Sequence, residues 1–114
     1  MNDITMGRKF YNDQIAFLEA NDVDGLISNH YNADAALIGL DFTVEGHEAL
    51  RENFRNYLSG LGHFRLKETT RFNETEDTIF FEATITGDQG DIRIYDAMVL
   101  TNGKISRHFT GVRD

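Results

Sequence analysis

The chain of 114 residues contains no cysteine and no proline. The missing cysteines exclude disulfide frameworks, cysteine-ligated zinc and iron–sulfur sites, and thiol nucleophiles. The missing prolines fit long, uninterrupted strands, because proline removes a backbone donor from the hydrogen-bond ladder of a sheet. A domain of this length can bury enough surface to be stable without a metal or a disulfide. We therefore expect one domain over residues 1–114.

Basic residues are also scarce, since 11 Lys and Arg stand against 19 Asp and Glu. The net charge of −8 argues against DNA or RNA as the main partner, because phosphate binding needs surplus Lys and Arg. Most of the excess lies in residues 1–50, which hold nine acids and two bases. The sequence shows no signal-peptide pattern and no apolar run of membrane-span length. We therefore expect a cytoplasmic protein that does not contact membranes.

The first half of the chain has the periodicity of amphipathic helices. Apolar residues recur on one stripe from about residue 5 to residue 20, and again over residues 23–31 and 46–61. Residues 35–40 form a compact apolar run of strand length between the second and third of these segments. The pattern predicts three helices with one short strand among them.

The second half alternates with a period of two, which predicts strands over residues 64–72, 78–86, 91–101 and 104–110. The connections are short, and Asn102-Gly103 is a strong hairpin signal because both residues tolerate positive φ. Short hairpin connections imply a four-stranded antiparallel meander. Helices that precede an antiparallel sheet indicate an α+β fold.

Strict alternation divides the strand residues between two faces, and we expect the apolar face to turn toward the helices. The residues assigned to this inner face are Phe64, Leu66, Glu68, Thr70, Phe72, Ile79, Phe81, Ala83, Ile85, Ile92, Ile94, Asp96, Met98, Leu100, Ile105, Arg107 and Phe109. Three of them, Glu68, Asp96 and Arg107, are charged. A charged group on an apolar face must be paired, hydrogen-bonded or neutralised.

Asp96 is the most notable of the three, because Ile94 and Met98 flank it on the same face. Apolar surroundings raise the pKa of a carboxyl, which can then act as a general acid or as a neutral hydrogen-bond donor at pH 7. The alternatives are an ion pair of Asp96 or Glu68 with Arg107, or a bulge that turns Asp96 outward. For Glu68 and Arg107 we expect the ion pair, whereas for Asp96 both interpretations stay open.

Gln14 interrupts the apolar stripe of the first helix, between Phe10 and Phe17. We expect its amide at the edge of the stripe, in solvent. The alternative is that the amide donates a hydrogen bond to a ligand oxygen.

The histidines His30, His47, His63 and His108 lack the spacing of a metal site, and we expect no metal and no cofactor. His30 lies on the apolar stripe of the second helix and is expected to be a hydrogen-bonded core residue. His108 is expected on the outer face of the sheet, together with Thr69 and Thr110.

The outer face of the predicted sheet carries Phe80, Tyr95 and Val99, which make it more apolar than a solvated face needs to be. An apolar patch rimmed by charge is typical of a protein–protein interface, so we expect a homodimer formed through this face. The alternative is that neighbouring Arg and Lys side chains cover the rings.

The order of these elements, with Gly46-His47-Glu48-Ala49-Leu50 opening the third helix and Asn102-Gly103-Lys104-Ile105 in the last hairpin, resembles the nuclear transport factor 2-like superfamily. Its members include ketosteroid isomerase and the SnoaL-like polyketide cyclases. The resemblance implies a cone-shaped fold, related to the cystatin-like fold, in which three N-terminal helices pack on a curved antiparallel sheet around a pocket.

The resemblance also suggests site residues. Asp96 falls at or next to the position of the oxyanion-stabilising Asp of ketosteroid isomerase and of the acid/base Asp of SnoaL-like cyclases. Gln14 stands where the isomerase has a Tyr donor. Gly39 stands at the position of the isomerase's general base, and Asp41 is the carboxylate nearest to that position in the sequence. We expect Asp96, Gln14 and Asp41 to be catalytic, with Gln14 and Tyr57 orienting the substrate.

Two hypotheses follow. The first is a cofactor-independent isomerase, cyclase or dehydratase that acts by acid–base chemistry on a hydrophobic carbonyl compound. The second is a non-catalytic dimeric ligand-binding or protein-interaction module, since the superfamily contains both. The substrate-binding residues expected on the pocket wall are Phe10, Phe17, Phe54, Tyr57, Phe81, Ile94 and Met98.

Overall fold

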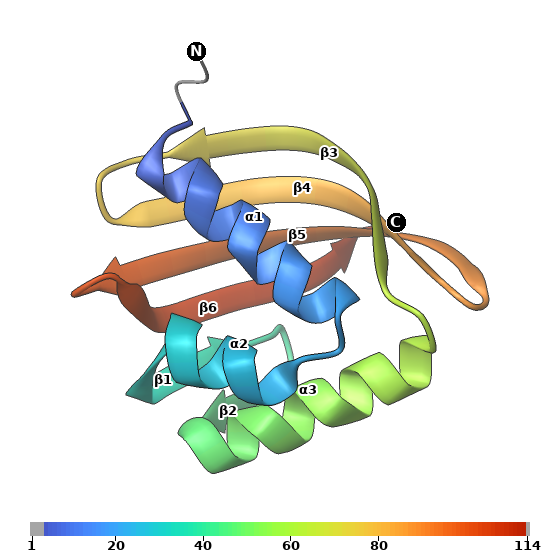
Figure 1. The fold of residues 1–114 in the computed structure, drawn as a ribbon, viewed down its shortest axis with the longest axis horizontal. Helices are drawn as coiled ribbons and strands as arrows, with labels where there is room; N and C mark the ends of the chain where they lie inside the picture. The colour runs from blue at the N-terminus through green and yellow to red at the C-terminus, as the bar shows by residue number, and fades with distance from the viewer. Residues whose placement is uncertain (1–3, 114) are drawn as a thin grey trace.

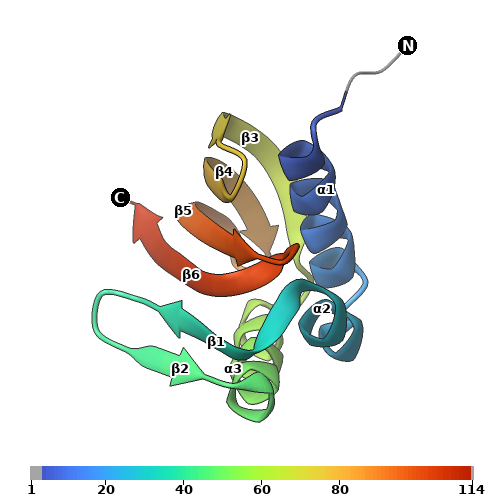
Figure 2. The same cartoon turned by 90° about the vertical axis from the view of Figure 1, so that its left-hand side faces the viewer.

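Three helices pack on one face of a curved six-stranded sheet in a computed structural model that describes residues 4–113 (Figures 1 and 2). The elements are α1 (Met6–Glu19), α2 (Val23–His30), β1 (Tyr31–Ile38), β2 (Thr43–Glu45), α3 (His47–Leu61), β3 (Arg65–Glu74), β4 (Thr78–Gly87), β5 (Gly90–Thr101) and β6 (Lys104–Arg113). The predicted α+β fold and the order of its elements are confirmed. The short strand β2 was not predicted.

Local capping explains where the first two helices begin. The Thr5 side chain accepts a hydrogen bond from the backbone N–H of Arg8, and the Asp22 side chain accepts one from Gly25. Each satisfies a backbone donor that has no partner within its helix. Among the described residues, no helix is both long and apolar enough to cross a membrane.

The strands are ordered β2-β1-β6-β5-β4-β3 across the sheet. Strands β3 to β6 form the predicted antiparallel meander. Strand β1 pairs in parallel with β6, because the chain enters it from α2 and runs along the far edge of the meander. The sheet is therefore mixed rather than purely antiparallel. Tyr31, predicted on the stripe of the second helix, is instead the first residue of β1.

A bulge in β6 reverses the predicted alternation of that strand. Val99 faces Arg107, whereas the next residue of β5, Leu100, faces Ile105, so Ser106 is an extra residue in β6. A one-residue insertion moves every following side chain to the other face. The placements of Arg107 and Phe109 on the inner face, and of His108 and Thr110 on the outer face, were therefore wrong.

Two similar irregularities occur in β3. Glu68 pairs with the outward-facing Thr84, and Thr69 pairs with the inward-facing Ala83. The inner-face assignments of Glu68 and Thr70 were therefore wrong, as was the outer-face assignment of Thr69. The Thr69 hydroxyl lies 2.6 Å from the hydroxyl of Tyr11 on α1. This hydrogen bond ties α1 to the inner face of the sheet.

The hydrophobic core lies between the helices and the inner face of β3 to β6. Its fully buried side chains include Leu26 of α2, Leu50 of α3 and Ile85 of β4. The core does not fill all the space that the sheet encloses, and what remains is the cavity described next.

Candidate active site

A cavity of about 740 Å³ opens between α1, α3, the β1–β2 loop and the inner face of the sheet. This volume lies in the range of small-molecule pockets. The predicted site residues that line it are Gln14, Asp41, Phe54, Tyr57, Phe81, Ile94, Asp96 and Met98. The lining is mostly apolar, so its few polar side chains stand out. We call this space the main cavity.

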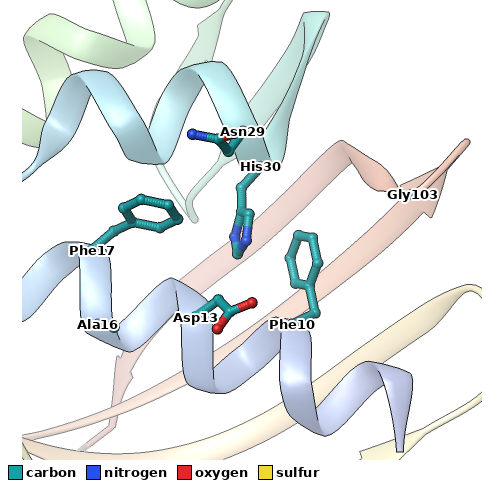
Figure 3. A pocket seen from close by; sticks show the side chains of 7 residues that line it. All are labelled: Phe10, Asp13, Ala16, Phe17, Asn29, His30 and Gly103. Carbon is teal, nitrogen blue, oxygen red and sulfur yellow. The ribbon is translucent and has the colours of Figure 1, made fainter.

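Phe10 and Phe17 lie elsewhere, so their placement on the wall of this pocket was wrong. They line a separate hollow of about 450 Å³ beside the end of α2, which we call the His30 hollow (Figure 3). The ring of His30 stacks on Phe10 at 3.8 Å between centroids and meets the edge of Phe17 at 5.3 Å. The helical turn of α1 explains this, because successive residues point in different directions. Asp13 lines the His30 hollow, whereas the next residue, Gln14, lines the main cavity.

Asp96 and His108 form a buried pair on the floor of the main cavity. Asp96 Oδ1 lies 2.7 Å from His108 Nε2, and the two residues are 5% and 4% exposed. In the register of the sheet, Asp96 faces Thr110 and His108 faces Met98, so the hydrogen bond runs diagonally between β5 and β6. Arg107 is exposed on the other face. Glu68 also lies on that outer face, but β4 and β5 separate its strand from that of Arg107, and the ion pairs of the described residues do not include these two. The predicted ion pair of Glu68 with Arg107 was therefore wrong, and the partner of Asp96 is His108.

The pair continues into a line of buried hydrogen bonds. His108 Nδ1 lies 2.8 Å from the Tyr31 hydroxyl, which accepts a hydrogen bond of 3.0 Å from Gln14 Nε2. Gln14 Oε1 lies 2.7 Å from Nδ1 of His30. We call Asp96, His108, Tyr31, Gln14 and His30 the buried network.

Gln14 is only 1% exposed, so the expectation that its amide lies in solvent was wrong. Its Nε2 and its Oε1 are each hydrogen-bonded within the network. The expectation that His30 is a hydrogen-bonded core residue is confirmed. Among the described residues, every buried side-chain nitrogen and oxygen has a hydrogen-bond partner.

Burial determines the charge states within the network. It lowers the pKa of His30 to about 4, so this imidazole is neutral at pH 7. Burial also raises the pKa of the Tyr31 hydroxyl, and the neighbouring charge of Asp96 raises it further. The same two causes, in the same order, raise the pKa of Tyr57 on the cavity wall. Both tyrosines therefore keep their hydroxyl hydrogens at pH 7.

The β1–β2 loop and the end of β6 border the cavity with exposed apolar side chains. Leu40, Phe42 and Val112 are 90%, 42% and 66% exposed and contribute to its lining. Asp41, also on this border, is exposed and therefore solvated, in contrast to Asp96. An apolar border favours a hydrophobic ligand.

Within residues 4–113, no group of three or more His, Cys, Asp or Glu side chains is arranged to hold a metal ion.

His108 and Tyr31 were missed as site residues because their orientation depends on pairing between distant segments. His108 and Tyr31 are 77 residues apart, and the bulge at Ser106 turns His108 inward. Within the sequence, Asn102-Gly103 indicates the hairpin before β6 but not a bulge after it. The motif therefore predicts the turn and not the face on which His108 lies.

Comparisons with known proteins agree with this architecture. Residues 8–108 match the family model described as the SnoaL-like domain. A proposed isomerase of the SnoaL-like family from Agrobacterium tumefaciens is 12% identical, with 97% of this chain and 100% of the other covered and a TM-score of 0.82. A proposed ketosteroid isomerase from Kribbella flavida is also 12% identical, with 96% and 78% covered and a TM-score of 0.81.

A de novo designed protein with a curved β-sheet is similar as well, at 16% identity, 99% and 88% coverage and a TM-score of 0.80. No curated protein matches the chain. At such identities the structural likeness shows the fold alone, so the function must be argued from the cavity.

Proposed function

Because the chain belongs to the SnoaL-like domain family, we propose that it is a cofactor-independent acid–base enzyme acting on a hydrophobic carbonyl compound. The observation that carries this proposal is the buried Asp96–His108 pair on the floor of an apolar cavity of about 740 Å³. A carboxylate held in apolar surroundings by one hydrogen bond is suited to proton abstraction next to a carbonyl. Isomerases, cyclases and dehydratases all use such a step.

In this reaction His108 Nε2 donates to Asp96 Oδ1 and keeps the carboxylate oriented. Asp96 Oδ2 removes a proton from the carbon next to the substrate carbonyl, and the electron pair of the broken C–H bond forms an enolate. The proton then returns from Asp96 to the same or to another carbon. Donors aimed at the developing oxyanion lower the barrier, and the Tyr57 hydroxyl and the Asn53 amide line the cavity where they could fill this role.

The other two predicted catalytic residues take different places in the proposal. Gln14 lines the cavity, but its amide nitrogen and oxygen are both hydrogen-bonded to other side chains, so we give it no part in the proton transfer. Asp41 lies at the border of the cavity, where its exposed carboxylate favours polar ends of a ligand that project toward solvent.

The exchange of substrate hydrogen for deuterium tests the proposal without knowledge of the natural reaction. Purified protein is incubated in D2O with 2-tetralone and with 5-androstene-3,17-dione, and deuterium next to the carbonyl is measured by mass spectrometry. We expect exchange by the wild type and a loss of about 10²–10⁴-fold in Asp96→Asn, because the amide cannot accept the proton. The fold should be kept, because the amide oxygen can still accept from His108.

Asp91→Asn is the matched control, since Asp91 lies on the same strand but is exposed and bonded to Lys67. Exchange should be unchanged in this variant. Equal exchange rates in wild type and Asp96→Asn would contradict the proposal. Binding of both ketones without any exchange would instead support the alternative, a non-catalytic ligand-binding module.

We also propose that a second copy of this chain covers the outer face of the sheet. Phe80, Ala97 and Phe109 face one another in register across β4, β5 and β6. Phe80 and Phe109 are 54% and 41% exposed. The outward turn of Phe109 adds a ring to the predicted patch, which also contains Tyr95 and Val99. This apolar row supports a homodimer, because self-association would remove both rings from water.

A further inference from the structure

The buried network connects two spaces on opposite sides of α1. Asp96 and His108 line the main cavity. His30 lines the His30 hollow on the other side, where its side chain extends from the end of α2 toward α1 (Figure 3). Tyr31 and Gln14 join these ends and are 0% and 1% exposed. Four hydrogen bonds of 2.7–3.0 Å run through the line without a gap.

The hydrogens of the network can be assigned by counting, starting from Gln14. In the observed orientation its Nε2 donates to the Tyr31 hydroxyl and its Oε1 accepts from His30 Nδ1. The Tyr31 hydrogen must then go to His108 Nδ1, the other hydrogen-bond partner of that hydroxyl. His108 therefore carries its hydrogen on Nε2 and donates it to the Asp96 carboxylate. This arrangement corresponds to the base form of the pair.

A proton on Asp96 Oδ2 leaves this arrangement unchanged, because His108 Nε2 can still donate to Oδ1. A proton that lies on His108, or between His108 and Asp96, cannot be accommodated in it. If Asp96 is protonated and donates to His108 Nε2, or if His108 becomes an imidazolium, His108 Nδ1 carries a hydrogen that points at Tyr31. The Tyr31 hydroxyl then faces donors from both His108 and Gln14, and its own hydrogen is left without an acceptor. A buried hydroxyl hydrogen without an acceptor is costly.

Rotation of the Gln14 amide by half a turn removes the conflict. Gln14 Oε1 then accepts from Tyr31, while Nε2 donates to Nδ1 of a neutral His30 whose own hydrogen moves to Nε2, on the side of the hollow. Every bond from His108 to His30 reverses, and every donor keeps an acceptor. This arrangement corresponds to the acid form of the pair.

We propose that Gln14 and Tyr31 are positioning residues, and that the Gln14 amide reverses the direction of the buried network whenever a proton taken up by the pair moves onto His108 or onto the bond between His108 and Asp96. The network thus provides a hydrogen-bond partner for each donor both when the pair is in its base form and when His108 shares the added proton. His30 anchors the far end, since its Nδ1 accepts or donates according to the amide. This inference rests on the proposed function, because it assigns the pair a catalytic proton.

The surroundings of the network leave few other groups that could control it. The charge of Asp96 acts on Tyr11 of α1, Tyr31 of β1 and Tyr57 of α3, and Asp41 of the β1–β2 loop shares the cavity lining. Within the described part of the chain, neither Lys nor Arg lines the main cavity.

At the other end, the charges that act on His30 are those of Asp13 and Lys9, both on α1. These two side chains form an exposed ion pair with each other at 2.9 Å.

Nuclear magnetic resonance of the wild-type protein labelled with 15N tests the proposal directly. At pH 8 we expect His108 with hydrogen on Nε2 and not on Nδ1. As the pH falls, the side-chain amide signals of Gln14 and the ring nitrogens of His30 should shift with the same midpoint as His108. A Gln14 amide that stays unchanged while His108 titrates overturns the proposal.

Gln14→Glu sharpens the test, because a carboxylate can only accept and therefore favours the reversed arrangement. The His108 Nδ1 hydrogen should persist to a pH about one unit or more above that of the wild type. Asn53→Asp is the matched control, since it adds the same charge to the cavity lining outside the network. An equal shift in both variants would mean that the added negative charge alone causes it, and would overturn the proposal.

Tyr31→Phe provides a second variant in which the line is interrupted. His108 should still titrate, but Gln14 and His30 should no longer follow it. If they still follow, the coupling does not run through the network. These measurements need no substrate, so they are independent of the deuterium-exchange test. If the Gln14 amide follows His108 but the protein catalyses no exchange, only the catalytic role is overturned. If the protein catalyses exchange but the Gln14 amide does not follow His108, only this inference is overturned.

Discussion

Polar side chains have different surroundings on the two faces of the curved sheet. On the inner face, Asp96 and His108 are buried among apolar side chains, and the hydrogen bond between them is 2.7 Å long. On the outer face, charged side chains stay partly exposed and pair across strands, as Glu82 does with Arg71 at 3.8 Å and with Arg113 at 2.6 Å. The outer face carries an apolar row instead, which includes Phe80.

This difference shows where polar side chains matter in the molecule. An exposed ion pair contributes little to stability, because water competes for both partners. A buried polar group loses its hydration, so each donor and acceptor must find a partner in one geometry. The inner face therefore specifies one arrangement of side chains, whereas the outer face tolerates several.

The largest expected difference concerns two neighbouring residues of β4 that point to opposite faces. Phe81→Ala should lower the free energy of unfolding by about 3–5 kcal/mol, because Phe81 is 3% exposed and its loss leaves a cavity. Phe80→Ala, at 54% exposure, should change it by no more than about 0.5 kcal/mol in the monomer. Urea denaturation followed by circular dichroism measures both. Equal losses would remove the distinction between the two faces.

The next effect is the pH dependence that the buried network gives to stability. The folded pKa of His30 is about 4, whereas an unfolded histidine titrates near 6.5. The unfolded chain therefore binds more protons between these values. Stability from the neutral imidazole is full above pH 6.5 and is lost as the pH falls toward 4, by up to about 3 kcal/mol.

Urea denaturation at several values of pH between 7 and 4 checks this expectation. His30→Gln is the comparison, since it keeps a polar side chain that does not titrate. Its free energy of unfolding should fall less steeply than that of the wild type over this range. Parallel curves for the two proteins would assign the pH dependence to other groups.

The smallest effect on the stability of the single chain should come from the outer apolar row. Phe80→Glu and Phe109→Glu should leave the fold intact, since both rings are exposed. They should, however, turn the proposed dimer into a monomer, because the charge would have to be buried between two copies. Light scattering at micromolar concentration measures the mass. A monomeric wild type would contradict the proposed dimer.

The sequence predicted the helices and strands better than it predicted the face of the sheet on which each side chain lies. Changes of hydrophobic period identified the helices and the meander, because period depends on neighbouring residues. The strand β2, three residues long, has no period of its own to read. The faces of β3 and β6 failed after their bulges, because each bulge shifts the register by one residue and alternation alone cannot show it.

The candidate site was predicted in part for the same reason. Asp96 was correctly placed on the inner face, because no irregularity interrupts the pairing of β4 with β5. Phe10 and Phe17 were misplaced, since an apolar stripe on a helix does not reveal which of two neighbouring spaces each side chain enters. Gln14 was expected in solvent, because its partners Tyr31 and His30 belong to other elements.

The sequence by itself determined the α+β fold, the order of the elements and the presence of one carboxyl, Asp96, on an apolar face. These features depend on local hydrophobic period and turn chemistry. Only the tertiary structure decided that His108 rather than Arg107 pairs with this carboxyl, and that Tyr31 and Gln14 continue the line to His30. The physical reason is that hydrogen bonds between buried side chains depend on register and helix rotation, which arise when distant segments pack together.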